Sequence, residues 1–161
     1  MKSSRVTRFN YIVGNKPADT PEGVLEQIKN LCTFLIEEVL ETKNAANEAD
    51  WKEVVDGIPD IRYVASYLQD LAESVGCNVD RAFEKVCDNN DCKFTTSEVL
   101  ANKWKDERIE DGVECYVDTV VYEGETYYTV RRKEDGKVIK HRDFESVDLT
   151  DCIPADLLEN K

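Results

Sequence analysis

The sequence predicts a mainly α-helical fold with a small C-terminal antiparallel β-meander. Apolar residues recur at spacings of three and four through most of residues 22 to 108, which is the period of amphipathic helices. Start and stop signals divide this region into four helices. After Gly112 the pattern changes to the alternation that is typical of strands. A core of ordinary size is expected because 41% of the 161 residues are hydrophobic.

The first two predicted helices form the longest part of the helical region. The first covers about residues 22 to 47, with Thr20 as its N-cap and Pro21 directly behind the cap. The second is expected through residues 61 to 75, and Gly76 is a natural stop after it.

Two shorter helices and the strands follow. The third helix is expected to open at Asn78 and to end before the sequence DNND. The fourth begins with a capping box from Thr95 to Glu98 and continues to about Arg108. The three predicted strands have the sequences ECYVDTVVY, ETYYTVRR and KVIKHRDF, joined by the turns EG and EDG. We therefore expect an all-α domain over residues 1–110, followed by a β extension and tail over residues 111–161.

Charge and cysteine content restrict the class of function. A net charge of −13 argues against nucleic-acid partners, because binding their backbones requires positive charge. It leaves open a cation site or a mimic of nucleic acid. The six cysteines form no CxxC pair and there is one histidine, so we expect reduced thiols rather than zinc or disulfides. No membrane span or signal peptide is visible, and the expected location is cytoplasmic.

Carboxylates cluster on both long helices. On the first helix, Glu38 lies at the edge of the apolar stripe, and Glu41 shares a second face with Phe34. On the second, Glu53, Asp56 and Asp60 project within about 60° of one another on the side of the apolar residues, so they are expected to face inward. Inward carboxylates need a proton, a base or a metal ion. An all-oxygen site suits Mg²⁺ or Mn²⁺.

Simpler explanations exist for each cluster taken alone. Asp56 could cap a helix that starts there, with Pro59 in its first turn. The sequence EEVLE could be an acidic face in water. Two such segments separated by a short turn, each followed by an apolar helix, are rarer than either one, and this combination favours a functional site.

This arrangement of carboxylates resembles the MazG-like all-α nucleoside triphosphate pyrophosphohydrolases, which include phosphoribosyl-ATP pyrophosphohydrolase. The resemblance covers about residues 24 to 94. It consists of the pattern EE-x-x-E, then a gap, then E-x-x-D followed by a further Asp. The matching acids are Glu37, Glu38, Glu41, Glu53, Asp56 and Asp60. The sequence VCDNNDCKF is similar to the family's V-x-x-S-N-x-x-K segment, with Asn90 and Lys93 in the Asn and Lys positions and Asn89 in place of Ser.

The resemblance implies a four- to five-helix bundle-type core and Mg²⁺-dependent hydrolysis of a nucleoside or deoxynucleoside triphosphate to monophosphate and pyrophosphate. It implies that Glu37 orients the attacking water. The implied metal ligands are Glu38, Glu41 and Asp56, with either Asp60 or Glu53. Substrate contacts are implied for Asn90 and Lys93. Phe34 is a candidate pocket wall or a core residue. Family members form homodimers or homotetramers.

The basic segment 131–142 and the alternative functions stay open. This segment carries six basic and two acidic residues. It could extend over the triphosphate of a neighbouring subunit, or it could be a solvated strand edge protected by its charge. Its sequence is similar to C-terminal extensions of phage-type family members. The alternatives to the enzyme are an acidic, non-catalytic interaction protein of the DNA-mimic type, and a degenerate family member that binds nucleotides without cleaving them.

Overall fold

The structure, a computed structural model, describes residues 5–159. It is mainly helical with a small three-stranded antiparallel sheet, as predicted. Contacts divide the chain into two units, which are described separately. One unit contains the residues up to Val79 together with those from Thr150 onward, and the other is Asp80–Leu149. This grouping places the helix before residue 110 with the strands that follow it.

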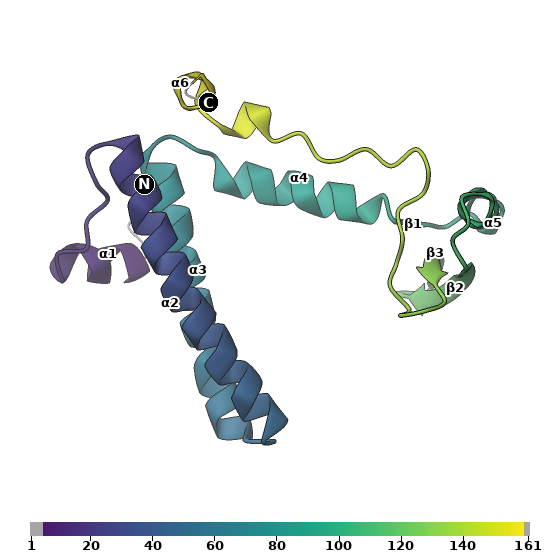
Figure 1. Cartoon of the computed structure of the whole chain (residues 1–161), viewed down its shortest axis with the longest axis horizontal. Helices are drawn as coiled ribbons and strands as arrows, with labels where there is room; N and C mark the ends of the chain where they lie inside the picture. The colour runs from purple at the N-terminus through teal and green to yellow at the C-terminus, as the bar shows by residue number, and fades with distance from the viewer. Residues whose placement is uncertain (1–4, 160–161) are drawn as a thin grey trace. The chain divides into compact units, whose positions relative to one another are not determined.

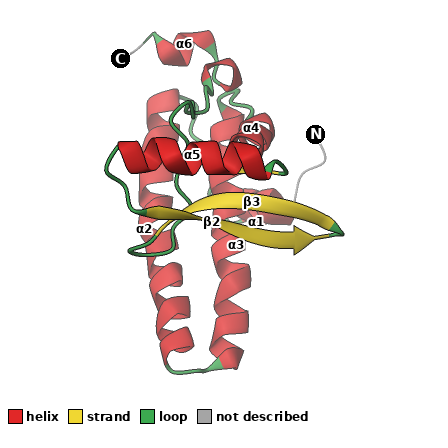
Figure 2. Cartoon of the chain, turned by 90° about the vertical axis from the view of Figure 1, so that its right-hand side faces the viewer, coloured by secondary structure: helices red, strands yellow, loops and turns green. Residues whose placement is uncertain are grey.

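The first unit is built on an antiparallel helical hairpin of α2 (Pro21–Asn47) and α3 (Trp51–Ser74), which lie side by side in Figures 1 and 2. The hydroxyl of Thr20 accepts a hydrogen bond from the Gly23 N–H, which confirms the predicted cap of α2. The turn between the helices contains Ala49 in the left-handed backbone region, at a φ of 57°.

Helix α3 begins ten residues earlier than the sequence pattern indicated. Asp50 is its N-cap, and the carboxylate of Asp50 accepts hydrogen bonds from the N–H groups of Lys52 and Glu53. The helix then continues through Pro59 without ending. The alternative in which Asp56 caps a helix that starts there is therefore wrong.

A heptad seam joins the two helices. Residues at spacings of three and four on each helix are buried or half-buried, which is the pattern of helices packed as in a coiled coil. On α2 the seam residues are Val24, Ile28, Leu31, Leu35, Glu38, Thr42 and Ala45. On α3 they are Val54, Gly57, Ile61, Val64, Leu68 and Leu71. A single carboxylate, that of Glu38, therefore occupies a seam position.

The core of this unit lies at the end of the hairpin away from the turn. Val24, Tyr67 and Leu71 are almost fully buried there. A short helix that the sequence analysis did not predict, α1 (Arg5–Ile12), is tied to this end by the Thr7 hydroxyl, which donates to Asp70 at 2.6 Å. The chain end is also attached, because the Asn78 N–H donates to the carbonyl of Cys152 at 2.8 Å.

The last two elements of this unit are short. They are η1 (Thr150–Cys152) and α6 (Ala155–Leu158).

The second unit contains α4 (Val79–Asp91) apart from its first residue, β1 (Phe94–Thr95), α5 (Glu98–Glu110), β2 (Cys115–Tyr122) and β3 (Glu125–Arg132). Figure 2 shows α5 alongside the sheet. The predicted capping box is wrong in detail. Ser97 caps α5 by accepting from the Leu100 N–H, whereas the Thr95 hydroxyl accepts from the Ser97 N–H.

The predicted meander is also wrong, because the third strand is β1 and the strand order is β1-β3-β2. The segment after Gly136 forms only two backbone hydrogen bonds with β3. The Arg132 N–H donates to the Lys137 carbonyl, and the Ile139 N–H donates to the Val130 carbonyl. Further along the same edge, β1 pairs with residues 128 and 129 of β3. The position that a third meander strand would need is therefore already occupied.

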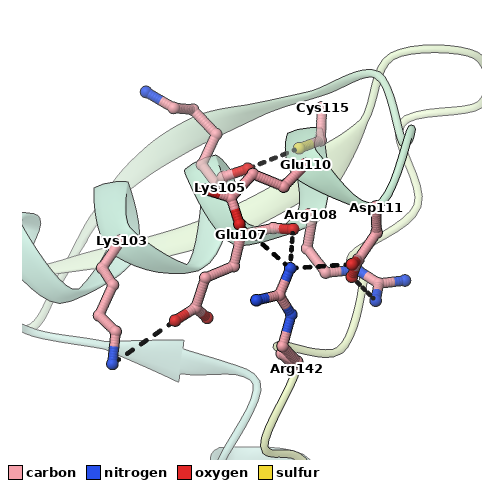
Figure 3. Close-up of polar contacts among 8 residues, drawn as sticks. All are labelled: Lys103, Lys105, Glu107, Arg108, Glu110, Asp111, Cys115 and Arg142. Atoms are coloured by element: carbon pink, nitrogen blue, oxygen red, sulfur yellow. Dashed lines mark hydrogen bonds and ion pairs between the residues drawn. The ribbon is translucent and has the colours of Figure 1, made fainter.

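The chain beyond this point is fixed to α5 by Arg142 (Figure 3). One terminal nitrogen of Arg142 donates to the Glu107 carbonyl at 2.9 Å, to Asp111 at 2.8 Å and to Glu110 at 3.3 Å. A cation at this position satisfies the free carbonyls and the negative dipole at the C-terminal end of the helix. The hydrogen bond from Arg142 to the Asp111 carboxylate lowers the pKa of Asp111.

The cysteines and the apolar character of the helices are the last features of the fold. All six cysteines are free thiols, and Cys115 and Cys152 are buried. Among the helices of residues 5–159, none has the length and apolar character needed to cross a membrane.

Candidate functional site

Glu38 is the centre of the candidate site because it occupies a seam position between two helices. Its side chain is half-buried, whereas Glu37 and Glu41 on the same helix are exposed. Burial raises the pKa of Glu38, and the negative charges of Asp60, Glu41, Glu37 and Asp56 raise it further. Carboxylates from both helices therefore act on one half-buried carboxylate.

The close approach of the two helices explains why these groups meet. A Cβ atom added to Gly57 of α3 would clash with the Thr42 side-chain oxygen and would lie 3.2 Å from the Thr42 Cβ atom of α2. The absent side chain lets α3 lie directly against α2 at this level. Glu38 is one turn from Thr42 along α2, so it lies level with the turn of α3 that contains Asp56 and Asp60.

The prediction that the acids of α3 face inward is wrong. Glu53, Asp56 and Asp60 are all exposed. Each of them immediately precedes a seam residue, namely Val54, Gly57 and Ile61. The acids therefore form a row along one border of the seam, where water solvates them, and Glu38 is the inward member of the group.

Asp60 and Glu53 differ in their relation to Glu38. Asp60 is the strongest of the charges that raise the pKa of Glu38, after burial, and Glu53 is not among those charges. Glu53 instead lies near the start of α3, where its carboxylate is 3.5 Å from the Lys52 ammonium group. The group of neighbouring acids is therefore Glu37, Glu38, Glu41, Asp56 and Asp60.

The donors fit a hard divalent cation in their chemistry, because they are all carboxylates and their mutual repulsion would be relieved by positive charge. Their spacing is wider than coordination requires. Within the described residues, no three side chains of His, Cys, Asp or Glu are close enough together to hold a metal ion as they stand.

The predicted substrate contacts lie in two different units. Phe34 is on α2, one turn before Glu38, and is 47% exposed, so it is not a core residue. Asn90 and Lys93 are in the second unit, where the Lys93 ammonium group donates to the Asn90 side-chain oxygen at 2.5 Å. These two residues are therefore adjacent to each other.

Sequence reasoning missed two residues that shape the site. Thr42 and Gly57 are the small residues that let the helices approach each other, and the Thr42 hydroxyl donates to the Glu38 carbonyl at 2.9 Å. A glycine in the middle of a helix was the available signal, because glycine weakens helices and usually has a packing reason there.

Comparison with known proteins identifies no relative. No protein-family model, curated protein or solved structure matches this chain.

Proposed function

We propose that this protein is a nucleoside triphosphate pyrophosphohydrolase, which hydrolyses a nucleoside or deoxynucleoside triphosphate to the monophosphate and pyrophosphate with Mg²⁺. The observation that supports the proposal is the position of Glu38, a carboxylate inside a helical seam with four further acids around it. A half-buried carboxylate with a raised pKa and no basic partner is typical of functional sites.

In this proposal, Glu38, Glu41, Asp56 and Asp60 hold the cation, with Mn²⁺ as a possible substitute. The cation would supply the positive charge that stabilises phosphate oxygens in the transition state. Glu53 is left out of this set because it does not belong to the group around Glu38.

The other residues act on water and on the nucleotide. Glu37, exposed beside Glu38, orients the attacking water. Lys93 neutralises phosphate charge and Asn90 hydrogen-bonds the nucleotide. Phe34, with its exposed ring one turn from Glu38, forms a wall of the nucleotide pocket. These roles come from the motif resemblance together with the exposure of the side chains.

The working form is proposed to be a homodimer or homotetramer in the cytoplasm. The hairpin of the single chain leaves large apolar side chains uncovered on both helices, which favours burial against another copy. On α2 and α3 these side chains include Ile36 at 59%, Leu40 at 49%, Val55 at 62% and Ile58 at 55% exposure. The free thiols fit a reducing compartment.

A second candidate function is favoured by the exposure of the other acids. Glu37, Glu41, Asp56 and Asp60 are open to solvent, and the protein carries a net charge of −13. An acidic interaction protein that occupies a basic groove would present such a surface. A nucleotide-binding protein without hydrolytic activity is the remaining alternative.

The test is product analysis with a panel of nucleoside and deoxynucleoside triphosphates, with Mg²⁺, with Mn²⁺ and with chelator. The proposal expects metal-dependent formation of equal amounts of monophosphate and pyrophosphate from at least one nucleotide. Release of phosphate with diphosphate would indicate another reaction. A folded protein that releases nothing from any nucleotide would overturn the catalytic proposal and favour a binding function.

A further inference from the structure

We propose that the free edge of β2 binds an extended segment of another protein by strand addition, and that this segment carries basic residues at its ends. The bound segment would extend the sheet of the second unit by one strand. This interaction is independent of the proposed hydrolysis, because no residue of the carboxylate group around Glu38 takes part in it.

One edge of the sheet is open, whereas the other edge is covered. The strand order is β1-β3-β2, so β2 has a neighbouring strand on one side only. The opposite edge of β3 is occupied by β1 and, further along, by the two backbone hydrogen bonds with the segment after Gly136. β2 pairs with β3 along its whole length without a bulge. Its outer edge is therefore a regular row of 8 residues with which another strand can pair.

Alternate residues of β2 direct their backbone groups toward this outer edge. The two-residue turn 123–124 between β2 and β3 has positive φ at both positions, 51° and 85°, as in a type I′ turn. The residue pair next to such a turn is hydrogen-bonded within the hairpin, and so is every second pair before it. The N–H and C=O groups of Val117, Thr119 and Val121 consequently face away from β3.

Most of these outward groups have no protein partner. The Thr119 N–H donates to the Asp118 carboxylate at 3.0 Å, which agrees with its outward direction. Within residues 5–159, no protein group forms a hydrogen bond with the backbone of Val117 or Val121 on this side. An incoming strand would bond with these two residues and would replace the contact between Thr119 and Asp118.

The side chains of this edge are apolar and open to solvent. Val120, Val121 and Tyr122 are 50%, 68% and 63% exposed. The single charge within the strand, that of Asp118, is neutralised by Arg131 at 2.6 Å. The strand contains no Lys and no Pro, which are residues that commonly prevent pairing at a free edge. β-Branched and aromatic side chains instead favour cross-strand contacts.

The charges at the two ends of β2 indicate which segment fits. Glu114 precedes the strand and Glu123 follows it, and no Lys or Arg occurs between residues 113 and 130. The Glu114 side chain is 85% exposed, and the Lys133 ammonium group is 4.0 Å from its carboxylate. Basic residues at both ends of an incoming strand would lie beside the two glutamates and would be attracted to them.

Like charges disfavour a second copy of β2 as the occupant. In an antiparallel pair, outward groups must face outward groups, so a two-fold pair that overlaps most of β2 is centred on Asp118 or on Thr119. The first register places Asp118 opposite Asp118 of the second copy. The second register places Glu123 beside Glu114 of the second copy. Charge repulsion opposes both registers, whereas a basic segment avoids it.

The test uses the full-length protein and a synthetic peptide of about nine residues, which spans β2 at about 3.3 Å per residue. Its sequence alternates threonine and valine between two terminal lysines, and both ends are blocked. Fluorescence anisotropy of the labelled peptide gives the Kd. Val121→Pro removes an outward N–H but no bond to β3, and it should weaken binding at least about tenfold. Val121→Thr keeps that N–H and is the matched control, with an expected change below about twofold.

A second set of measurements tests the charges. Glu123→Gln is expected to weaken binding about threefold, which is the effect of losing one surface ion pair. Glu145→Gln is the control, because Glu145 is an exposed acid outside β2, and its substitution should leave the Kd unchanged. A peptide with glutamate in place of both lysines should bind at least about tenfold more weakly. Equal binding of the two peptides would overturn the basic character of the partner.

Hydrogen exchange measured by NMR locates the peptide on the sheet. Binding should slow the exchange of the Val117 and Val121 amides, and it should leave the Val120 amide unchanged because that group already bonds to β3. The proposal is overturned if wild type does not bind the peptide at about 1 mM, or if Val121→Pro binds it as tightly as Val121→Thr. Protection of Val117 and Val121 that rises with protein concentration without peptide would also overturn it, because a second copy would then be the occupant.

Discussion

Glu38 on α2 and Asp60 on α3 lie on facing helices, and after burial itself the charge of Asp60 is the strongest influence that raises the pKa of Glu38. The pairing joins residues that are 22 positions apart in sequence. Carboxylates from two helices therefore form one group. Their mutual repulsion destabilises the hairpin unless a proton or a cation is bound.

Substituting Glu38 by Gln should stabilise the protein at neutral pH. Because the pKa of Glu38 is raised by folding, the folded chain binds this proton more tightly than the unfolded chain does. The free energy of unfolding therefore falls as the pH rises from the ordinary glutamate pKa through the raised one. Below that window the carboxyl group is protonated in both states, and the advantage of Glu38→Gln should disappear.

Urea denaturation at about pH 7 and about pH 4 would measure this difference. Glu53→Gln is the control, because Glu53 is an exposed carboxylate on α3 outside the group around Glu38. Equal effects of the two substitutions at both pH values would contradict the special position of Glu38.

Divalent cation should stabilise the fold through Asp60 and not through Glu53. A ligand that binds only the folded state raises the melting temperature, and the rise increases with the ligand concentration relative to its Kd. Wild type and Glu53→Gln are expected to show a rise in Tm with millimolar Mg²⁺ or Mn²⁺, and Asp60→Asn should lose it. Thermal scans with and without chelator measure the shift. A shift retained in Asp60→Asn and lost in Glu53→Gln would reverse the assignment.

Replacing Gly57 by Ala should destabilise the hairpin although alanine favours helices. The gain in helix propensity is about 1 kcal/mol, but the new methyl group would enter the space of the Thr42 side chain. Overpacking of this kind costs about 1–3 kcal/mol, so we expect a net loss of stability. A double-mutant cycle with Thr42→Ala provides the check, because removing the Thr42 side-chain oxygen should recover most of the loss.

The apolar surface of the hairpin should hold two or more copies of the chain together. Ile58→Asp places a charge on that surface and is expected to reduce the mass in solution to that of a single chain. Val99→Asp is the control, since Val99 is 81% exposed on α5 in the other unit. Light scattering after size exclusion gives the mass. A monomeric wild type would contradict this prediction.

Periodicity predicted the long helices well, but local capping signals decided their ends. The start of α2 was predicted because Thr20 and Pro21 are adjacent and unambiguous. The start of α3 was missed because Pro59 suggested a boundary, whereas Asp50 caps a helix that tolerates the proline inside it. The short α1 lacks enough turns to show a helical period.

Strand pairing and the position of Glu38 depend on contacts that are distant in sequence. The strand pattern gave β2 and β3 correctly, but only the fold reveals that Phe94 and Thr95 occupy the edge of β3. Likewise, the α2 pattern alone placed Glu38 at the edge of the apolar stripe. Only the packing of α3 against α2, which is close at Gly57 and Thr42, shows that Glu38 lies within the seam.

The central claim is that the carboxylate group around Glu38 performs metal-dependent hydrolysis, and pyrophosphate release tests it most directly. Wild type, Glu38→Gln, Glu41→Gln and the control Glu53→Gln would be assayed with the best nucleotide at saturating Mg²⁺. The account predicts release by wild type and by Glu53→Gln, with a loss of at least about 100-fold in the other two variants. Undiminished release by Glu38→Gln, or no release by folded wild-type protein, would contradict it.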